Sequence, residues 1–282
     1  MPRRIGVCAW IYGDAALEET FARIAGAGYD GVEIPGEPHR WTAGELRRLL
    51  TAAGLAPLGL TASCGFPATR RDLAHPDPAI RRDAVGYVVD CLHLAAEIGA
   101  PLVQMLPSGE TRLAPLASRD EEWTWSVAAM QQAGREAARC WVRVCIEPLN
   151  RYEAYLVTNA ADALAYVTAV GSPWVGMTLD CFHANLEEPD IAASIRAAGP
   201  CLWHLHVADT NRRGLGHGHL DLAPIGEALD AIGYPGAVVL EVMPPGPDPF
   251  QSIKDQHSPA ILDGYLRDSL APLRAHLGMH HS

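Results

Sequence analysis

The sequence predicts a (β/α)₈ barrel, in which eight parallel strands alternate with helices and close into a ring. Short apolar runs alternate with longer amphipathic stretches at a pitch of about thirty residues, a pattern typical of parallel strands joined by right-handed helical crossovers. Eight such runs occur in 282 residues, and one barrel typically needs about 250. The runs are apolar almost throughout, as strands buried on both faces should be. A doubly wound open sheet is the alternative that this alternation leaves.

The predicted strands are short runs dominated by aliphatic residues. We place them at residues 5–9, 31–34, 57–62, 102–106, 142–147, 175–180, 202–207 and 238–241. Helical patterns lie between them: residues 17–25 and 79–98 each repeat apolar positions on one face and run into a Gly-Ala sequence that ends the helix. No linker rich in Pro, Gly and Ser divides the chain, so we expect residues 1–282 to form a single domain.

Composition and charge narrow the class of protein. No apolar run reaches the ~20 residues that a membrane span needs, and we interpret the apolar stretch near the N-terminus as a strand rather than a signal peptide, which favours a cytoplasmic location. The 33 acidic and 22 basic residues give a net charge of −11 without a basic stripe, which argues against a nucleic-acid partner. Seven cysteines without a CxxC pair indicate reduced thiols rather than disulfides or structural zinc.

Four consecutive predicted strands end in a residue that can bind a metal ion. The fifth ends at Glu147, the sixth at Asp180, the seventh at His206 and the eighth at Glu241. These residues are 33, 26 and 35 positions apart (180 − 147, 206 − 180, 241 − 206), close to one strand–helix unit each. Because parallel strands point the same way, the four side chains should meet at the C-terminal face of the barrel, where the active sites of this fold lie.

Three carboxylates and one imidazole at one place cannot stay unpaired, because buried like charges raise each other's pKa and destabilise the fold. A divalent cation would remove that repulsion. A ligand set of mostly oxygen with one nitrogen suits Mn²⁺, Mg²⁺ or Co²⁺ better than zinc, which prefers thiolates. We therefore expect one divalent metal ion as the cofactor, with Mn²⁺ as the first choice.

The segments that follow these strands resemble a known family. Glu147 begins Glu-Pro-Leu-Asn-Arg-Tyr-Glu, Asp180 begins Asp-Cys-Phe-His-Ala-Asn-Leu-Glu-Glu, and His206 begins His-Val-Ala-Asp-Thr-Asn-Arg. Together with the glutamate that ends the eighth strand, these motifs make the chain similar over essentially the whole barrel to the xylose-isomerase-like sugar isomerase/epimerase superfamily. Within that superfamily it most resembles the ketose 3-epimerases, which act on D-tagatose, D-allulose or L-ribulose.

The resemblance implies that Glu147, Asp180, His206 and Glu241 are the metal ligands, and that Glu147 and Glu241 are also the catalytic acid and base. The chemistry agrees with this assignment. Removing a proton beside a ketone needs a Lewis acid to stabilise the enediolate, worth several kcal/mol. Inverting the carbon needs a base on one face and an acid on the other. We therefore expect an isomerase of carbohydrate metabolism that epimerises a free keto-sugar at C3 in a metal-dependent reaction.

The resemblance also implies contacts with the sugar. His183 would hydrogen-bond the substrate near the metal, Arg212 would contact its O2, and Glu153 would hold its terminal hydroxyl, although Glu153 could equally cap a helix. The residues after the first and third strands, Trp10 and Phe66, could line the pocket or be ordinary core aromatics.

The resemblance is looser elsewhere. Cys181 stands where the family has threonine, and the loops after the first four strands match poorly, so the identity of the sugar stays open. At the end of the second strand, in the segment Glu33-Ile-Pro-Gly-Glu37, Glu33 is a better candidate than Glu37 for a further carboxylate lining the site. We expect His204 to point away from His206, toward the outer helices.

Other functions use similar parts. An aldose–ketose or inosose isomerase, or a lyase acting on a 3-keto-glycoside, could use the same metal site. A phosphodiesterase of the endonuclease IV type would need more histidines and a basic face, and a catalytically silent binding barrel would not need the four ligands. We expect the partners to be a small sugar and a second copy of the chain, in a homodimer or homotetramer.

Overall fold

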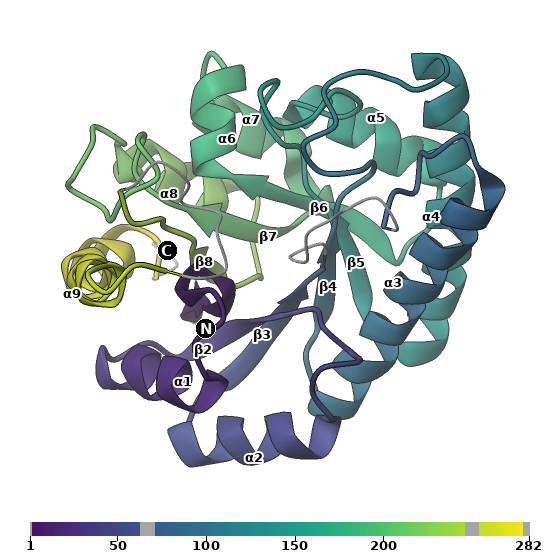
Figure 1. The fold of residues 1–282 in the computed structure, drawn as a ribbon. Helices are drawn as coiled ribbons and strands as arrows, with labels where there is room; N and C mark the ends of the chain where they lie inside the picture. The colour runs from purple at the N-terminus through teal and green to yellow at the C-terminus, as the bar shows by residue number, and fades with distance from the viewer. Residues whose placement is uncertain (1, 63–70, 246–253, 279–282) are drawn as a thin grey trace.

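Eight parallel strands form one closed barrel in chain order, which confirms the predicted fold (Figure 1). The computed structural model describes residues 2–62, 71–245 and 254–278. The strands of the barrel are β1 (Ile5–Cys8), β2 (Gly31–Pro35), β3 (Ala56–Thr61), β4 (Leu102–Met105), β5 (Arg143–Ile146), β6 (Val175–Asp180), β7 (Leu202–Val207) and β8 (Val238–Leu240).

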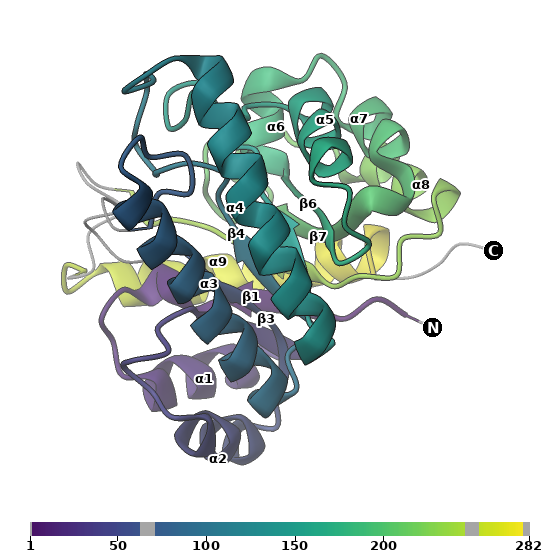
Figure 2. The same ribbon diagram turned by 90° about the vertical axis from the view of Figure 1, so that its right-hand side faces the viewer.

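Helices surround this barrel, and Figure 2 shows the long pair α3 and α4 lying side by side on its outside. No helix within the described parts of the chain is both long and apolar enough to cross a membrane. The α-helices are α1 (Leu17–Gly26), α2 (Ala43–Ala53), α3 (Pro78–Ile98), α4 (Arg119–Cys140), α5 (Ala160–Val170), α6 (Cys181–Glu187), α7 (Ile191–Ala198), α8 (Leu222–Ala231) and α9 (Ser258–His276), and the 3₁₀ helices are η1 (Ala9–Tyr12) and η3 (Gly199–Cys201).

Local sequence signals set the limits of these helices. Helix α2 begins with a capping box, in which the Thr42 side chain accepts from the backbone of Glu45 and the Glu45 side chain accepts from the backbone of Thr42. Helix α3 begins after Asp77, whose carboxylate accepts from the backbone N–H of Ala79. It ends at Gly99, whose φ of 77° is a left-handed conformation that glycine adopts without strain.

Four predicted strands (residues 5–9, 102–106, 142–147 and 238–241) are longer than the observed ones, and the differences in the first and fifth strands bear on the site. The first ends at Cys8 because Ala9 begins η1, the short helix whose Trp10 side chain reaches Glu241. The fifth ends at Ile146, yet Glu147 still donates its backbone N–H to the carbonyl of Met105 at 3.1 Å. Glu147 therefore remains tied to β4 and keeps its place at the rim.

Close packing near the N-terminal ends of the barrel strands depends on a glycine in β6. A Cβ atom on Gly176 would lie 2.5 Å from the indole ring of Trp203 on β7. That ring cannot easily move, because its Nε1–H donates to the carbonyl of Pro200 at 2.9 Å and the Arg143 guanidinium packs over it with 4.6 Å to the ring centroid.

We expect Gly176→Ala to lower the free energy of unfolding by about 1–3 kcal/mol, the usual cost of overpacking a filled space. The matched control is Gly86→Ala, at an exposed position of helix α3 where an added Cβ would meet no described atom within 4 Å. That change should raise stability by about 0.5–1 kcal/mol, because alanine has less backbone freedom to lose. Urea denaturation of both variants tests the pair, and equal effects at the two positions would contradict the packing argument.

Candidate active site

Four buried side chains converge at the carboxyl ends of neighbouring strands. Glu147 follows β5, Asp180 ends β6, His206 lies on β7 and Glu241 follows β8. Each is at most 5% exposed, and one candidate ligand atom from each lies within 4.8 Å of the others. The parallel register accounts for the convergence, since Asp180 pairs directly with His206 across the two strands. We refer to these four residues as the acidic cluster.

Two buried atoms of the acidic cluster have no hydrogen-bond partner within the described parts of the chain. Nδ1 of His206 lies 3.1 Å from Oε2 of Glu241 and 3.4 Å from Oε1 of Glu147. This Nδ1 and the Oε1 of Glu147 are both buried, and neither makes a hydrogen bond to any residue that the structure describes. Buried polar atoms are nearly always satisfied in folded proteins. A nitrogen and an oxygen left facing one another, in a set of three carboxylates and one imidazole, fit an oxygen-preferring divalent cation.

Arg212 brings positive charge to the acidic cluster. It follows β7 in a left-handed backbone conformation (φ 63°) that is uncommon for residues other than glycine. Its guanidinium donates to Oδ2 of Asp180 and, at 2.6 Å, to Oε2 of Glu241. It also packs over the ring of Phe182, with 4.8 Å to the centroid. Charge-assisted bonds of this kind are strong when shielded from water, so Arg212 offsets part of the negative charge.

Two further donors orient the glutamates of the acidic cluster. Trp10, on η1, donates its Nε1–H to Oε1 of Glu241 at 2.7 Å. Gln104, on β4, donates to Oε2 of Glu147. Each donor holds one oxygen of its carboxylate, which leaves the other oxygen facing the cluster. Trp10 was among the predicted pocket residues, whereas Gln104 lies inside an apolar strand and carries no sequence signal of its own.

The two glutamates differ in their affinity for protons. Burial raises the pKa of Glu147 to about 8, with His206 opposing the rise and Glu241 adding to it. Burial alone would also raise the pKa of Glu241, but the positive charges of His206 and Arg212 hold it well below its usual value. Without a cation, Glu147 is therefore the carboxyl that holds a proton more readily and Glu241 the one that stays ionised.

His183, the first-turn histidine of α6, is held in one tautomer. Its Nδ1 accepts from the backbone N–H of Asn150 at 3.3 Å and from the side-chain amide of Asn150 at 2.8 Å. Burial lowers the pKa of His183, which favours the neutral ring. The ring proton is then on Nε2, which lies 3.7 Å from Oδ2 of Asp180. His183 thus presents a donor toward the acidic cluster.

The same asparagine places a carboxylate at the rim. Asn150 donates from its amide to Oε1 of Glu153 at 2.8 Å, and Oε1 of Glu153 lies 4.0 Å from Nδ1 of His183. A second carboxyl, which the sequence analysis missed, is Glu110 in the loop after β4. It lines a small cavity together with Glu147, and burial raises its pKa to about 7, with Glu153 adding to the rise.

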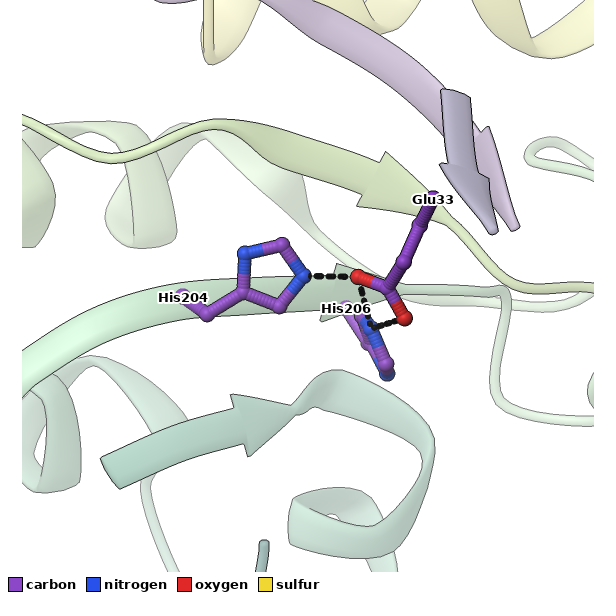
Figure 3. A group of neighbouring side chains, drawn as sticks. All are labelled: Glu33, His204 and His206. Atoms are coloured by element: carbon purple, nitrogen blue, oxygen red, sulfur yellow. Dashed lines mark hydrogen bonds and ion pairs between the residues drawn. The ribbon is translucent and has the colours of Figure 1, made fainter. Parts of the chain in front are cut away.

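Glu33 lies inside the barrel beneath the acidic cluster, where Figure 3 shows both histidines of β7 pointing at its carboxylate. It is fully buried and accepts from Nε2 of His204, while Nε2 of His206 is 3.2 Å from each of its oxygens. The expectation that His204 points toward the outer helices is wrong. Residues two apart on a strand share a face, so His204 and His206 both point inward, with ring centroids 4.9 Å apart.

Two other residues of the sequence analysis lie away from the acidic cluster or cannot be placed. Glu37 forms an ion pair with Arg71 at 3.1 Å, on the side of the molecule where Arg71 packs over the ring of Tyr87. Phe66 lies outside the described residues. The expected place of Phe66 in the pocket therefore stays a prediction. Of the two glutamates, Glu33 and not Glu37 reaches the barrel interior.

Comparison with known proteins identifies the family. A model of the family described as xylose isomerase-like TIM barrel matches residues 21–258. The chain belongs to this family. A D-psicose 3-epimerase of Ruminiclostridium cellulolyticum is 34% identical over 228 residues, or 78% of this chain and 75% of the relative. An L-ribulose 3-epimerase of Mesorhizobium japonicum is 30% identical over 236 residues, or 82% and 78% of the two chains.

A solved structure of a xylose isomerase-like barrel agrees with these relatives. D-psicose 3-epimerase with D-tagatose from Clostridium cellulolyticum H10 superposes with a TM-score of 0.87 at 27% identity, covering 98% of this chain and 100% of that one. The resemblance to the ketose 3-epimerases is thereby confirmed, and the chain is an enzyme of the epimerase and isomerase type. Cys181 is fully buried at the start of α6, directly before Phe182 and His183.

The role of Arg212 in offsetting buried charge can be tested on the EDTA-treated protein. We expect Arg212→Met to lower the free energy of unfolding by about 3–5 kcal/mol, because it leaves buried carboxylates without their partner. The control Arg151→Met removes the same charge from an ion pair with Glu187 in which Arg151 is 63% exposed. Its denaturation midpoint should stay close to that of the unchanged protein, because exposed pairs are weak. Equal stability of the two variants in urea would show that Arg212 does not offset the negative charge of the acidic cluster.

Proposed function

We propose that the protein epimerises a free ketose at C3 with the help of one divalent cation. The observation that carries the proposal is the meeting of Glu147 and Glu241 at Nδ1 of His206, which makes no hydrogen bond to the described residues. Two carboxylates at one buried point can serve as a base and an acid on the two faces of one carbon. The curated relatives named for D-psicose and L-ribulose support a free ketose as the substrate class.

The acidic cluster would hold the cation through Glu147, Asp180, Glu241 and Nδ1 of His206. When bound, the cation would act as a Lewis acid that stabilises negative charge on the sugar's carbonyl and hydroxyl oxygens. Mn²⁺ is the ion we expect, because the ligand set has one nitrogen among hard oxygens.

The chain's own residues would move the proton and hold the sugar. One of Glu147 and Glu241 takes the proton from C3, and the other returns a proton from the opposite face. Trp10 fixes the direction of Glu241 through its 2.7 Å hydrogen bond, as Gln104 fixes that of Glu147. Oriented groups of this kind remove the need to reorganise the site during the reaction.

Contacts with the rest of the sugar would come from three residues around the acidic cluster. His183 offers its Nε2–H as a donor, Arg212 would turn from Asp180 to an oxygen of the sugar, and Glu153 would accept from a terminal hydroxyl. Asn150 supports two of them, since it donates to both His183 and Glu153. Glu110 adds a carboxyl near Glu153.

Cation binding is expected at one site per chain. Titration of the EDTA-treated protein with Mn²⁺ should give one equivalent by calorimetry, and free Mn²⁺ at 100 times its Kd should raise stability by about 2.7 kcal/mol. Asp180→Asn should abolish this binding. The control is Asp190→Asn, which changes the capping aspartate of the neighbouring helix α7, where asparagine caps as well. Full Mn²⁺ affinity in Asp180→Asn would remove Asp180 from the ligand set.

The reaction can be followed by deuterium uptake. The Mn²⁺-loaded protein, incubated in D₂O with a panel of ketoses, should incorporate deuterium at C3 and produce the C3 epimer, as detected by NMR. Glu147→Gln and Glu241→Gln should each lower the rate at least 100-fold, because general acid–base catalysis contributes about 10²–10⁴. The control Glu227→Gln changes an exposed glutamate of α8. Deuterium at C1 or C2 with an aldose product would assign the protein to the aldose–ketose isomerases instead.

A further inference from the structure

A buried network connects four strands beneath the acidic cluster. Its centre is the carboxylate of Glu33, on β2, which is 0% exposed. The Nε2 atoms of His204 and His206, both on β7, face this carboxylate (Figure 3). The hydroxyl of Thr61, on β3, donates to its Oε1, and the thiol of Cys8, on β1, lies 3.6 Å from the same oxygen. A carboxylate accepts only, so these contacts suit an ionised Glu33 surrounded by donors.

The network fixes which nitrogen of His206 is available. Because Glu33 only accepts, Nε2 of His206 keeps its proton whether the ring is charged or neutral, and Nδ1 is the nitrogen that can give up its proton to a cation. The other nitrogen, Nδ1, lies 3.1 Å from Glu241 and 3.4 Å from Glu147, and makes no hydrogen bond in the part of the chain that the structure describes. A metal-binding histidine typically gives its second N–H to a carboxylate, which sets its tautomer and orientation and strengthens it as a ligand.

We propose that Glu33 is a positioning residue for the divalent cation site, which holds His206 with Nδ1 directed at the cation, and that His204 in turn holds Glu33. This inference rests on the proposed function, because it takes His206 as a ligand. Glu33 itself contributes no ligand atom. Its effect would pass through His206, and its loss should weaken the binding of the cation before any sugar is present.

His204 explains how Glu33 stays in place. Its Nε2 donates to Oε2 of Glu33, and its ring packs edge-to-face against that of His206. Thr61 donates to the other oxygen of Glu33. With donors on both oxygens, the carboxylate cannot rotate upward into the acidic cluster, so it remains beneath His206 and does not compete with the ligands.

A second cation is the alternative for these side chains. Glu33, His204 and His206 offer three ligand atoms within 4.8 Å of one another. Such a site would require His206 to lose its Nε2 proton and bridge two cations. The first site already requires Nδ1 of His206, so the two arrangements predict different stoichiometry, one Mn²⁺ per chain or two.

The test compares Glu33→Gln with Glu37→Gln. Both remove a carboxylate near the end of β2, but Glu37 pairs with Arg71 away from the acidic cluster. We expect Glu33→Gln to weaken Mn²⁺ binding by about 10–100-fold, measured by calorimetry on the sugar-free protein, because a glutamine side chain accepts through only one oxygen. Glu37→Gln should bind Mn²⁺ within twofold of the unchanged protein. Pulsed EPR should also detect an altered ¹⁴N coupling from His206 in Glu33→Gln alone.

The outcomes separate this inference from the proposed function. Unchanged Mn²⁺ affinity and ¹⁴N coupling in Glu33→Gln would overturn the role of Glu33 and leave the proposed function intact. Two Mn²⁺ ions per chain, one of them lost in Glu33→Gln, would overturn the positioning role of Glu33 and show that Glu33 is a ligand of a second cation. Failure of the unchanged protein to bind Mn²⁺ would overturn both.

A second variant keeps the test decisive if Glu33→Gln does not fold. His204→Phe retains an aromatic ring and the carboxylate of Glu33, but removes the donor to one of its oxygens. We expect Mn²⁺ binding to weaken at least threefold in this variant, because Glu33 can then move away from His206. Unchanged affinity in a folded His204→Phe would overturn the proposal.

Discussion

Three carboxylates, those of Glu147, Asp180 and Glu241, lie buried within a few ångströms of one another, and the barrel mouth tolerates them only because other groups offset their repulsion. Arg212 donates to two of them, and His206 lies against the third. Uncompensated burial of charge costs several kcal/mol per ion. The positions of the surrounding side chains are therefore restricted, because each must contact a particular carboxylate oxygen.

The sequence predicted the members of this arrangement well because the parallel fold turns strand ends into neighbours. Asp180 and His206 end adjacent strands in direct register, so locating the strands located both side chains. Glu147 and Glu241 follow by the same reasoning from β5 and β8. The barrel rule needs only the order and direction of the strands, which the alternating hydrophobic pattern supplies.

The partners of these residues were harder to foresee. Gln104 lies 43 positions from Glu147, and Asn150 lies 33 from His183. Nothing in a single sequence connects such pairs, because their contacts arise only when the barrel closes. The orientation of His204 was a different case, since the period of two along a strand already places it on the face of His206. The partly buried Glu110, in a loop without regular periodicity, gave no pattern to interpret.

The two carboxylate oxygens of Asp180 have different partners. Its Oδ1 accepts from the backbone N–H of Phe182 at 2.7 Å and so begins α6, while its Oδ2 belongs to the acidic cluster. A ligand that displaces Oδ2 would therefore also displace the first turn of α6, which carries His183. By thermodynamic linkage, the factor by which the cation changes the affinity for the sugar equals the factor by which the sugar changes the affinity for the cation. A cation bound by the acidic cluster and a sugar held by His183 would therefore be coupled through the first turn of α6.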